Sequence, residues 1–230
     1  VEGMLTSFGI ILMRKISLLS KVIFFKIIFT ERKSPPFNFK VNASKLISDS
    51  ASVFDYKDYE IIIVNDGSTD DTKNVAEKFV GYQKGKYGEV KVSLINKPNG
   101  GKASALNLGI KVSKAEFVLC MDGDSILTPL SLKMAIRHFV NPEIGAVAGN
   151  VKVLNRKKFF TDLQALEYVE GLNMARGAQS AIRLVNIIPG PIGVFRRAAV
   201  QSVDYYSGDT FAEDADMTLR LISQGLKIYY

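Results

Sequence analysis

A run of five apolar residues, 117–121, ends abruptly at Asp122-Gly123-Asp124. A continuous apolar run of this length is typical of a strand buried on both faces of a parallel sheet. Ligands of open α/β sheets bind beyond the carboxyl ends of such strands. Two carboxylates one residue apart supply the oxygen ligands that Mg²⁺ and Mn²⁺ prefer, and these ions also bind substrate phosphates. The junction therefore predicts a metal–diphosphate site, with a plain Asp-Gly turn as the alternative.

Short apolar runs alternate with helical patterns from residue 59 onward. Strands are predicted at residues 61–64, 90–95, 117–121 and 146–153, and helices at about 70–82, 103–112, 130–139 and 160–183. This alternation indicates βαβ units, and therefore an α/β fold with a mostly parallel sheet flanked by helices. The 230 residues suffice for one large domain with an appendage.

The N-terminal segment carries most of the positive charge. Residues 1–45 contain eight Lys or Arg against Glu2 and Glu31, whereas the net charge of the whole chain is +7. Residues 4–29 are strongly apolar, but basic residues interrupt them before any stretch reaches the roughly 20 residues of a clean spanning helix. The pattern predicts a basic amphipathic helix on a membrane surface. The end of a spanning helix and a soluble core helix are the alternatives.

Two prolines, Pro35 and Pro36, block helix continuation and mark a linker. The chain is therefore divided into a membrane-associated helix and linker, residues 1–36, and a catalytic domain, residues 37–230. Membrane lipid is an expected partner of the first part. Nucleic acid is not an expected partner, because the main body shows no basic stripe interleaved with aromatic residues.

Two turns at the ends of predicted strands carry candidates for nucleotide binding. Asp66 follows the strand 61–64, where its carboxylate can accept hydrogen bonds from a base or ribose, and Gly67 allows close backbone approach. Lys102 follows a Gly-rich turn and precedes the helix 103–112, whose N-terminus can attract phosphate. The alternatives are an Asx turn at Asp66 and an exposed lysine in an ordinary turn.

A pair of acidic residues, Glu213-Asp214, precedes the amphipathic helical pattern 217–222. Acidic residues at a helix start are often only partners of the helix dipole. A carboxylate at the mouth of a site can instead act as a general base that deprotonates a sugar hydroxyl.

Taken in order, these segments resemble the family 2 inverting glycosyltransferases of the GT-A fold. The resemblance is greatest to the membrane-bound, processive synthases of the poly-N-acetylglucosamine, chitin and cellulose type, and it covers about residues 55–230. The matching stretches are residues 60–70, 99–107, 120–124, 145–151 and 212–216, joined by residues 164–168 and 189–197 for the processive subgroup. Each motif alone is weak, but their order and spacing together are specific.

The resemblance implies a donor site for a UDP-sugar. Asp66 and Gly67 would hold the nucleotide, and Lys102 would contact the diphosphate or the uridine side. Asp124 would bind a Mg²⁺ or Mn²⁺ ion together with the diphosphate, with Asp122 beside the ribose or the metal.

The resemblance also implies the chemistry. Asp214, with Glu213 beside it, would activate the acceptor hydroxyl for one in-line displacement that inverts the anomeric centre. The expected function is transfer of a sugar from a UDP-sugar to a growing polysaccharide or oligosaccharide, and N-acetylglucosamine is the expected sugar. The expected location is the plasma membrane, with the catalytic domain on the cytoplasmic side.

Two departures from the family pattern lead to further expectations. Residues 37–41 run directly into 42–47, so the strand that opens the family's domain is expected to be missing. The chain ends at Tyr230 before any Gln-x-x-Arg-Trp motif, so a C-terminal part is expected to be missing too. These gaps favour an alternative function, an inactive fragment that binds nucleotide or scaffolds a membrane complex. A nucleotidyltransferase is a further alternative, but its Gly-rich basic loop near the start is not visible.

Overall fold

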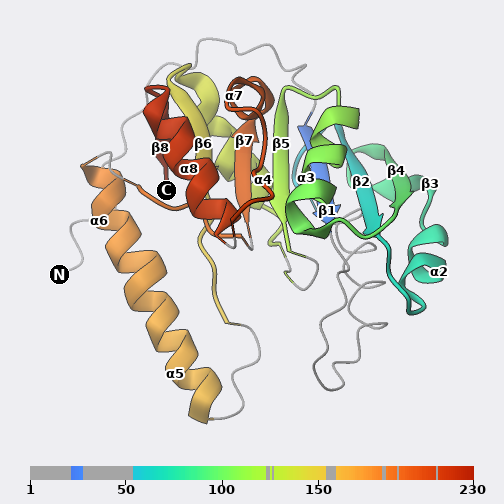
Figure 1. Cartoon of the computed structure of the whole chain (residues 1–230), viewed down its shortest axis with the longest axis horizontal. Coiled ribbons are helices and arrows are strands. Elements are labelled where there is room, and N and C mark those ends of the chain that lie inside the picture. The colour runs from blue at the N-terminus through green and yellow to red at the C-terminus, as the bar shows by residue number, and fades with distance from the viewer. Residues whose placement is uncertain are drawn as a thin grey trace.

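A computed structural model describes the backbone of residues 22–27 and residues 54–230, except 123, 124, 126, 154–158, 183, 184, 191 and 211. These residues form one eight-stranded sheet in the order β3-β4-β2-β1-β5-β7-β6-β8, with helices packed on its faces (Figure 1). The strands are β1 Val22–Ile27, β2 Tyr59–Asp66, β3 Gly81–Gly85, β4 Gly88–Lys97, β5 Phe117–Met121, β6 Ile144–Ala148, β7 Gly193–Arg196 and β8 Lys227–Tyr229.

The centre of the sheet is parallel. Strands β4, β2, β1 and β5 run in one direction, whereas β3 pairs antiparallel with β4, and β7 lies antiparallel between β5 and β6. Strand β8 pairs parallel with β6. The expected α/β fold is confirmed, and the sheet is mixed, with a parallel centre and antiparallel pairs at β3 and β7.

The helices lie between the strands in the chain. They are α2 Thr72–Glu77, α3 Gly101–Val112, α4 Ser131–Ile136, the 3₁₀-helix η1 Arg137–Val140, α5 Phe159–Tyr168, the π-helix η2 Val169–Met174, α6 Ala175–Ala181, α7 Arg197–Ser202 and α8 Glu213–Ser223. The segment from α5 to α6 forms one long helix at the edge of the molecule (Figure 1). Among the described helices, none combines the length and the apolar character needed to cross a bilayer.

Strand β1 overturns two expectations. Val22–Ile27 lies between β2 and β5 and pairs in parallel with both, with Phe24 opposite Ile61 on one side and Leu119 on the other. The prediction of a helix across residues 22–27 is therefore wrong, and so is the prediction that the first strand is missing. The run Val-Ile-Phe-Phe-Lys-Ile is rich in β-branched and aromatic residues, which favour strands, and its pairing satisfies backbone groups of both neighbours. Residues 1–21 and 28–36 of the expected helix and linker lie outside the described part.

The helix predicted at 70–82 is shorter than expected. It ends at Glu77, and β3 begins at Gly81, which has a φ of 114°. Glycine adopts this conformation without the steric cost that a Cβ would bring. The chain can therefore leave the helix and turn into an edge strand within a few residues.

The core lies on both faces of the sheet. Alternate residues of β2 and β5 point to opposite sides, so that Ile62 and Val118 pack with α3 and α8, whereas Ile61 and Leu119 pack with α4. All four side chains are at most 3% exposed. Burial on both faces explains why these strands are continuous apolar runs, and each such side chain contributes about 1.5–3 kcal/mol.

Candidate active site

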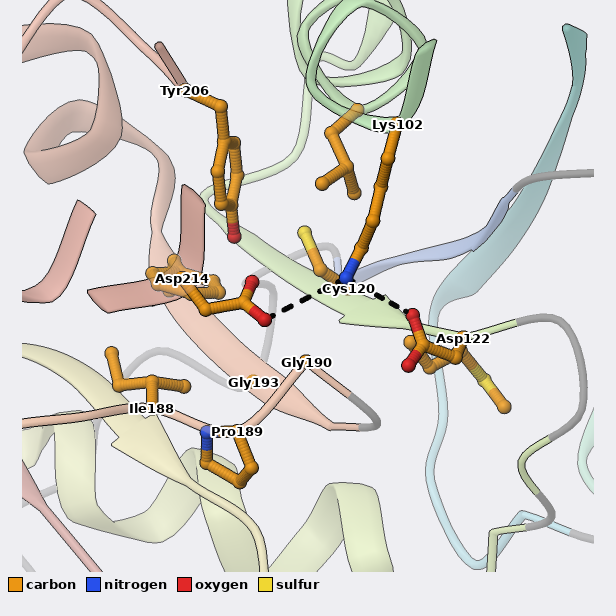
Figure 2. A pocket seen from close by; sticks show the side chains of 12 residues that line it. Lys102, Cys120, Asp122, Ile188, Pro189, Gly190, Gly193, Tyr206 and Asp214 are labelled. Atoms are coloured by element: carbon orange, nitrogen blue, oxygen red, sulfur yellow. Dashed lines mark ion pairs between the residues drawn. The ribbon is translucent and has the colours of Figure 1, made fainter. Parts of the chain in front are cut away.

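Lys102 lies at the centre of a group of carboxylates that come from two other parts of the fold (Figure 2). Its Nζ is 2.8 Å from Glu213 Oε1, 3.3 Å from Asp122 Oδ1 and 3.6 Å from Asp214 Oδ2. Lys102 is in the first turn of α3, Asp122 follows β5, and the other two acids open α8. Four residues predicted from sequence to form the site are thus brought together beyond the end of β5.

Lys102 is held as a cation. Its side chain is 31% exposed, and burial by itself disfavours the charge. The hydrogen bond to Glu213 and the charges of Asp122 and Asp214 outweigh burial and raise the pKa of Lys102 above its ordinary value. The site therefore contains a fixed positive charge at neutral pH.

The two acids at the start of α8 differ in their bonding to Lys102. Glu213 is within hydrogen-bond distance of the ammonium, whereas Asp214 at 3.6 Å is outside it. Burial raises the pKa of Asp214 to about 6; Glu213 and Asp122 add to this rise, and Lys102 opposes it. A carboxylate with a pKa near neutrality can take up and release a proton at physiological pH. The predicted role of Asp214 as the base stays a prediction, and its environment suits that role.

The segment 188–190 forms the opposite wall of the same pocket (Figure 2). A Cβ on Gly190 would lie 2.5 Å from Asp214 Oδ2 and 2.9 Å from Lys102 Nζ. Real Cβ contacts are not this short, so only glycine leaves the two side chains in place. The pocket has a volume of about 10 Å³, which is room for about one water molecule.

Tyr206 and Asn107 belong to the site, although sequence reasoning gave neither a role. Tyr206 is 4% exposed, lines the pocket, and points its hydroxyl towards Asp214 and Cys120 (Figure 2). Asn107 donates to the carbonyl of Tyr206 at 2.8 Å and accepts from its amide at 2.9 Å. The available sequence signal was the side-chain amide of Asn107, which stands between Leu106 and Leu108 in a mainly apolar helix.

Asp66 lies outside the pocket around Lys102. Its side chain is fully buried, and it accepts hydrogen bonds from the amides of Gly100 at 2.9 Å and Gly101 at 2.8 Å. It also forms an ion pair with Lys97. Asp66 therefore fixes the start of α3, the helix that carries Lys102. Its predicted contact with the nucleotide stays a prediction.

Gly67 allows the turn after β2 to pack closely on the turn before α3. It has a φ of 72°, and a Cβ there would lie 2.6 Å from the backbone nitrogen of Asn99. This close approach is to protein backbone, so Gly67 has a structural reason to be glycine. A contact of Gly67 with the nucleotide likewise stays a prediction.

The metal-ligand prediction concerns Asp122 and Asp124. Asp124 lies outside the described residues, and within the described part no group of three or more His, Cys, Asp or Glu is arranged to hold a metal ion. Asp122 lines the pocket with a carboxylate that is 33% exposed. Mg²⁺ typically binds one or two carboxylates together with substrate phosphates and water. The Asp122 carboxylate, placed at the pocket, fits one ligand position of such an ion.

Solved structures with the same architecture define the class of the fold. A mannosyltransferase from Pyrobaculum calidifontis in complex with GDP-Man and Mn²⁺ superposes with a TM-score of 0.70 at 20% identity, covering 91% of this chain and 54% of that one. Residues 1–349 of S. aureus TarS in complex with UDP-GlcNAc superpose with a TM-score of 0.63 at 19% identity, covering 90% and 55%. The fold is that of the GT-A glycosyltransferases.

Sequence relatives assign the family. The sequence model of glycosyl transferase family 2 matches residues 43–204, and the chain belongs to this family. The poly-β-1,6-N-acetyl-D-glucosamine synthase of Staphylococcus epidermidis is 32% identical over 184 residues, which cover 78% of this chain and 43% of the relative. The synthase of Staphylococcus aureus strain COL is 33% identical over 193 residues, covering 82% and 45%. The chain thus spans less than half the length of these relatives.

Proposed function

We propose that this chain transfers N-acetylglucosamine from UDP-N-acetylglucosamine to a growing polysaccharide by a metal-assisted, inverting displacement. The observation that carries the proposal is the group formed by Lys102, Asp122, Glu213 and Asp214 around one pocket. Membership of glycosyl transferase family 2 supports sugar transfer. Relatives named as poly-β-1,6-N-acetyl-D-glucosamine synthases support the sugar and the acceptor, and a fold neighbour in complex with UDP-GlcNAc supports the donor.

Asp214 is the residue that takes the proton in this proposal. Its pKa of about 6 leaves it deprotonated at pH 7 while keeping it a useful base. Glu213 lies closer to the ammonium of Lys102 than Asp214 does, at 2.8 Å against 3.6 Å, so the ion pair of Lys102 with the proposed base is the longer of the two. The acceptor hydroxyl loses its proton to Asp214 and attacks the anomeric carbon from the side opposite the leaving UDP. One displacement of this kind inverts the configuration.

Positive charge for the departing diphosphate would come from Lys102 and from a metal ion held by the neighbouring acids. Asp122 and Asp124 would hold a Mg²⁺ or Mn²⁺ ion, which supplies charge stabilisation of the leaving diphosphate when bound. The space beside Lys102 is too small for a sugar. We therefore expect the Lys102 side chain to leave at least one carboxylate as the donor enters, and to contact the diphosphate instead.

We also propose that the protein works at the plasma membrane, with its catalytic domain on the cytoplasmic side. Support comes from the composition of residues 1–21, which are apolar and contain Arg14, Lys15 and Lys21. Such a segment binds anionic lipid by apolar burial together with charge attraction. Sedimentation with anionic and with neutral vesicles tests this part of the proposal. If all the protein stays in the supernatant with both kinds of vesicle, membrane binding is excluded.

The decisive experiment combines binding and turnover. UDP with Mn²⁺ is titrated calorimetrically into wild type, Asp122→Asn and Asp214→Asn, and UDP release from UDP-N-acetylglucosamine is measured with an N-acetylglucosamine oligosaccharide as acceptor. We expect Asp122→Asn to weaken metal-dependent binding and Asp214→Asn to bind normally without turnover. Binding without turnover by wild type would favour the inactive-fragment alternative. The absence of both binding and turnover in wild type would overturn the proposal.

A further inference from the structure

Thr218 is a fully buried polar residue in an apolar part of α8. It is 0% exposed and lies between Met217 and Leu221, two residues of the core. Its Oγ1 accepts a hydrogen bond from the backbone amide of Ile188 at 3.0 Å and donates one to the backbone carbonyl of Asp214 at 2.7 Å. A single hydroxyl thus uses its donor and an acceptor site at once.

The two bonds join opposite walls of the active-site pocket. The bond to Asp214 is local, since a threonine often binds the carbonyl four residues earlier in a helix. The bond from Ile188 is not local, and it fixes the start of the segment that leads through Pro189 to Gly190. Gly190 in turn faces the Asp214 carboxylate so closely that no Cβ fits between them. Thr218 therefore controls how far this wall lies from Asp214.

Packing alone does not explain a threonine here. Valine has nearly the same shape, and its second methyl group would suit the apolar surroundings of Met217 and Leu221 better than a hydroxyl does. Without the hydroxyl, however, the buried amide of Ile188 would lose its partner, and Ile188 is only 2% exposed. Buried amides rarely remain unpaired, so the segment would shift in search of another acceptor.

We propose that Thr218 is a positioning residue, which sets the separation between the segment 188–190 and the Asp214 carboxylate and thereby places the acceptor hydroxyl against its base. This inference rests on the proposed function, in which Asp214 is the base. Catalytic groups act over short distances, and a displacement of about 1 Å can lower a rate about 100-fold. The effect is expected on the chemical step, because the two hydrogen bonds of Thr218 go to Ile188 and to Asp214, whereas Lys102 and Asp122 are the residues proposed to bind the diphosphate.

Three substitutions test the role of the hydroxyl. Thr218→Val removes it at nearly constant shape, Thr218→Ser keeps it but removes the methyl group, and Thr72→Val changes another buried threonine, in α2 and outside the pocket. For each we would measure kcat and KM with UDP-N-acetylglucosamine, the Kd of UDP with Mn²⁺, and the Tm. We expect Thr218→Val to lower kcat about 10- to 100-fold with little change in the UDP Kd, and both Thr218→Ser and Thr72→Val to retain most of the kcat.

The outcomes separate this inference from the proposed function. Wild type without turnover overturns the proposed function, and this inference with it. An active wild type whose kcat is unchanged by Thr218→Val overturns the inference alone. Equal losses of kcat in Thr218→Val and Thr218→Ser would also overturn it, because any change in the packing at this position, and not loss of the hydroxyl in particular, would then lower kcat. Should Thr218→Val fail to fold, Thr218→Ala removes the same hydroxyl together with the methyl group and carries the same expectation.

Discussion

Lys102 and Glu213 form a 2.8 Å ion pair that joins the first turn of α3 to the first turn of α8. The two helices pack on the same face of the sheet, and this pair connects their N-terminal ends beside the pocket. Asp214, one residue later, forms a longer ion pair of 3.6 Å with the same ammonium. Lys102 therefore lies closer to Glu213 than to the proposed base.

Replacing Glu213 should therefore change Asp214. In Glu213→Gln one negative charge that adds to the raised pKa of Asp214 is lost, and Lys102, which already pairs with Asp214 at 3.6 Å, loses its closer partner and can approach Asp214. Both changes lower that pKa below about 6, so the acidic limb of the rate profile should move to lower pH while the rate at pH 7 falls. The measurement is kcat/KM against pH. Glu170→Gln, on an exposed part of η2, is the matched control and should leave the profile unchanged.

The wild-type pH profile follows from the same group. A base must be deprotonated to act, so activity should be full above the pKa of Asp214 and fall as the pH decreases through about 6. Asp214→Asn cannot accept a proton, and we expect a loss of at least about 100-fold in kcat. Retention of wild-type turnover by Asp214→Asn would show that another residue is the base.

Gly190 provides a steric test of the pocket. In Gly190→Ala the new methyl group would meet Asp214 Oδ2 and Lys102 Nζ at less than 3 Å. Both are ends of flexible side chains, so the protein should still fold while the two groups move apart, and kcat should fall about 10-fold or more. Gly171→Ala is the control, because nothing lies within 4 Å of its Cβ and alanine favours helix. A kcat for Gly190→Ala equal to that of the control would show that this contact does not constrain the site.

Asp66→Asn should reduce stability before any ligand is added. The substitution leaves Lys97 without its ion-pair partner and removes one of the acceptors for the Gly100 and Gly101 amides. Loss of such buried partners costs about 1–3 kcal/mol, measurable as a lower free energy of unfolding in urea. Unchanged unfolding together with weaker UDP binding would instead support a direct contact with the nucleotide.

Much of the fold and the centre of the site could be predicted from sequence. Runs such as 117–121 are buried on both faces of the sheet, and this burial is visible in a local pattern. Asp122 follows one such run at the edge of the sheet where parallel strands end and ligands of such folds bind. Lys102 and Asp214 could be predicted from sequence for a related reason, since each lies in the first turn of a helix at that edge.

The features that were missed depend on distant pairing. Strand β1 contains Lys26 within an apolar segment that also fits a helix, and only its two neighbours in the sheet decide between these structures. The hydrogen bonds that Asn107 donates to Tyr206 and that Ile188 donates to Thr218 join residues that are 99 and 30 positions apart. No local periodicity reports such contacts.

The central place of β1 has a consequence for how the chain acquires its structure. One of its partners, β5, is synthesised much later than β1, since Phe24 aligns with Leu119. Contacts between segments so far apart in the sequence slow folding, and the nascent chain cannot close its sheet until β5 has left the ribosome. A chain that begins after residue 27 would expose two unpaired edges in the middle of the sheet, where natural proteins avoid them because they promote aggregation. Residues 22–27 should therefore be retained in any soluble version of the domain.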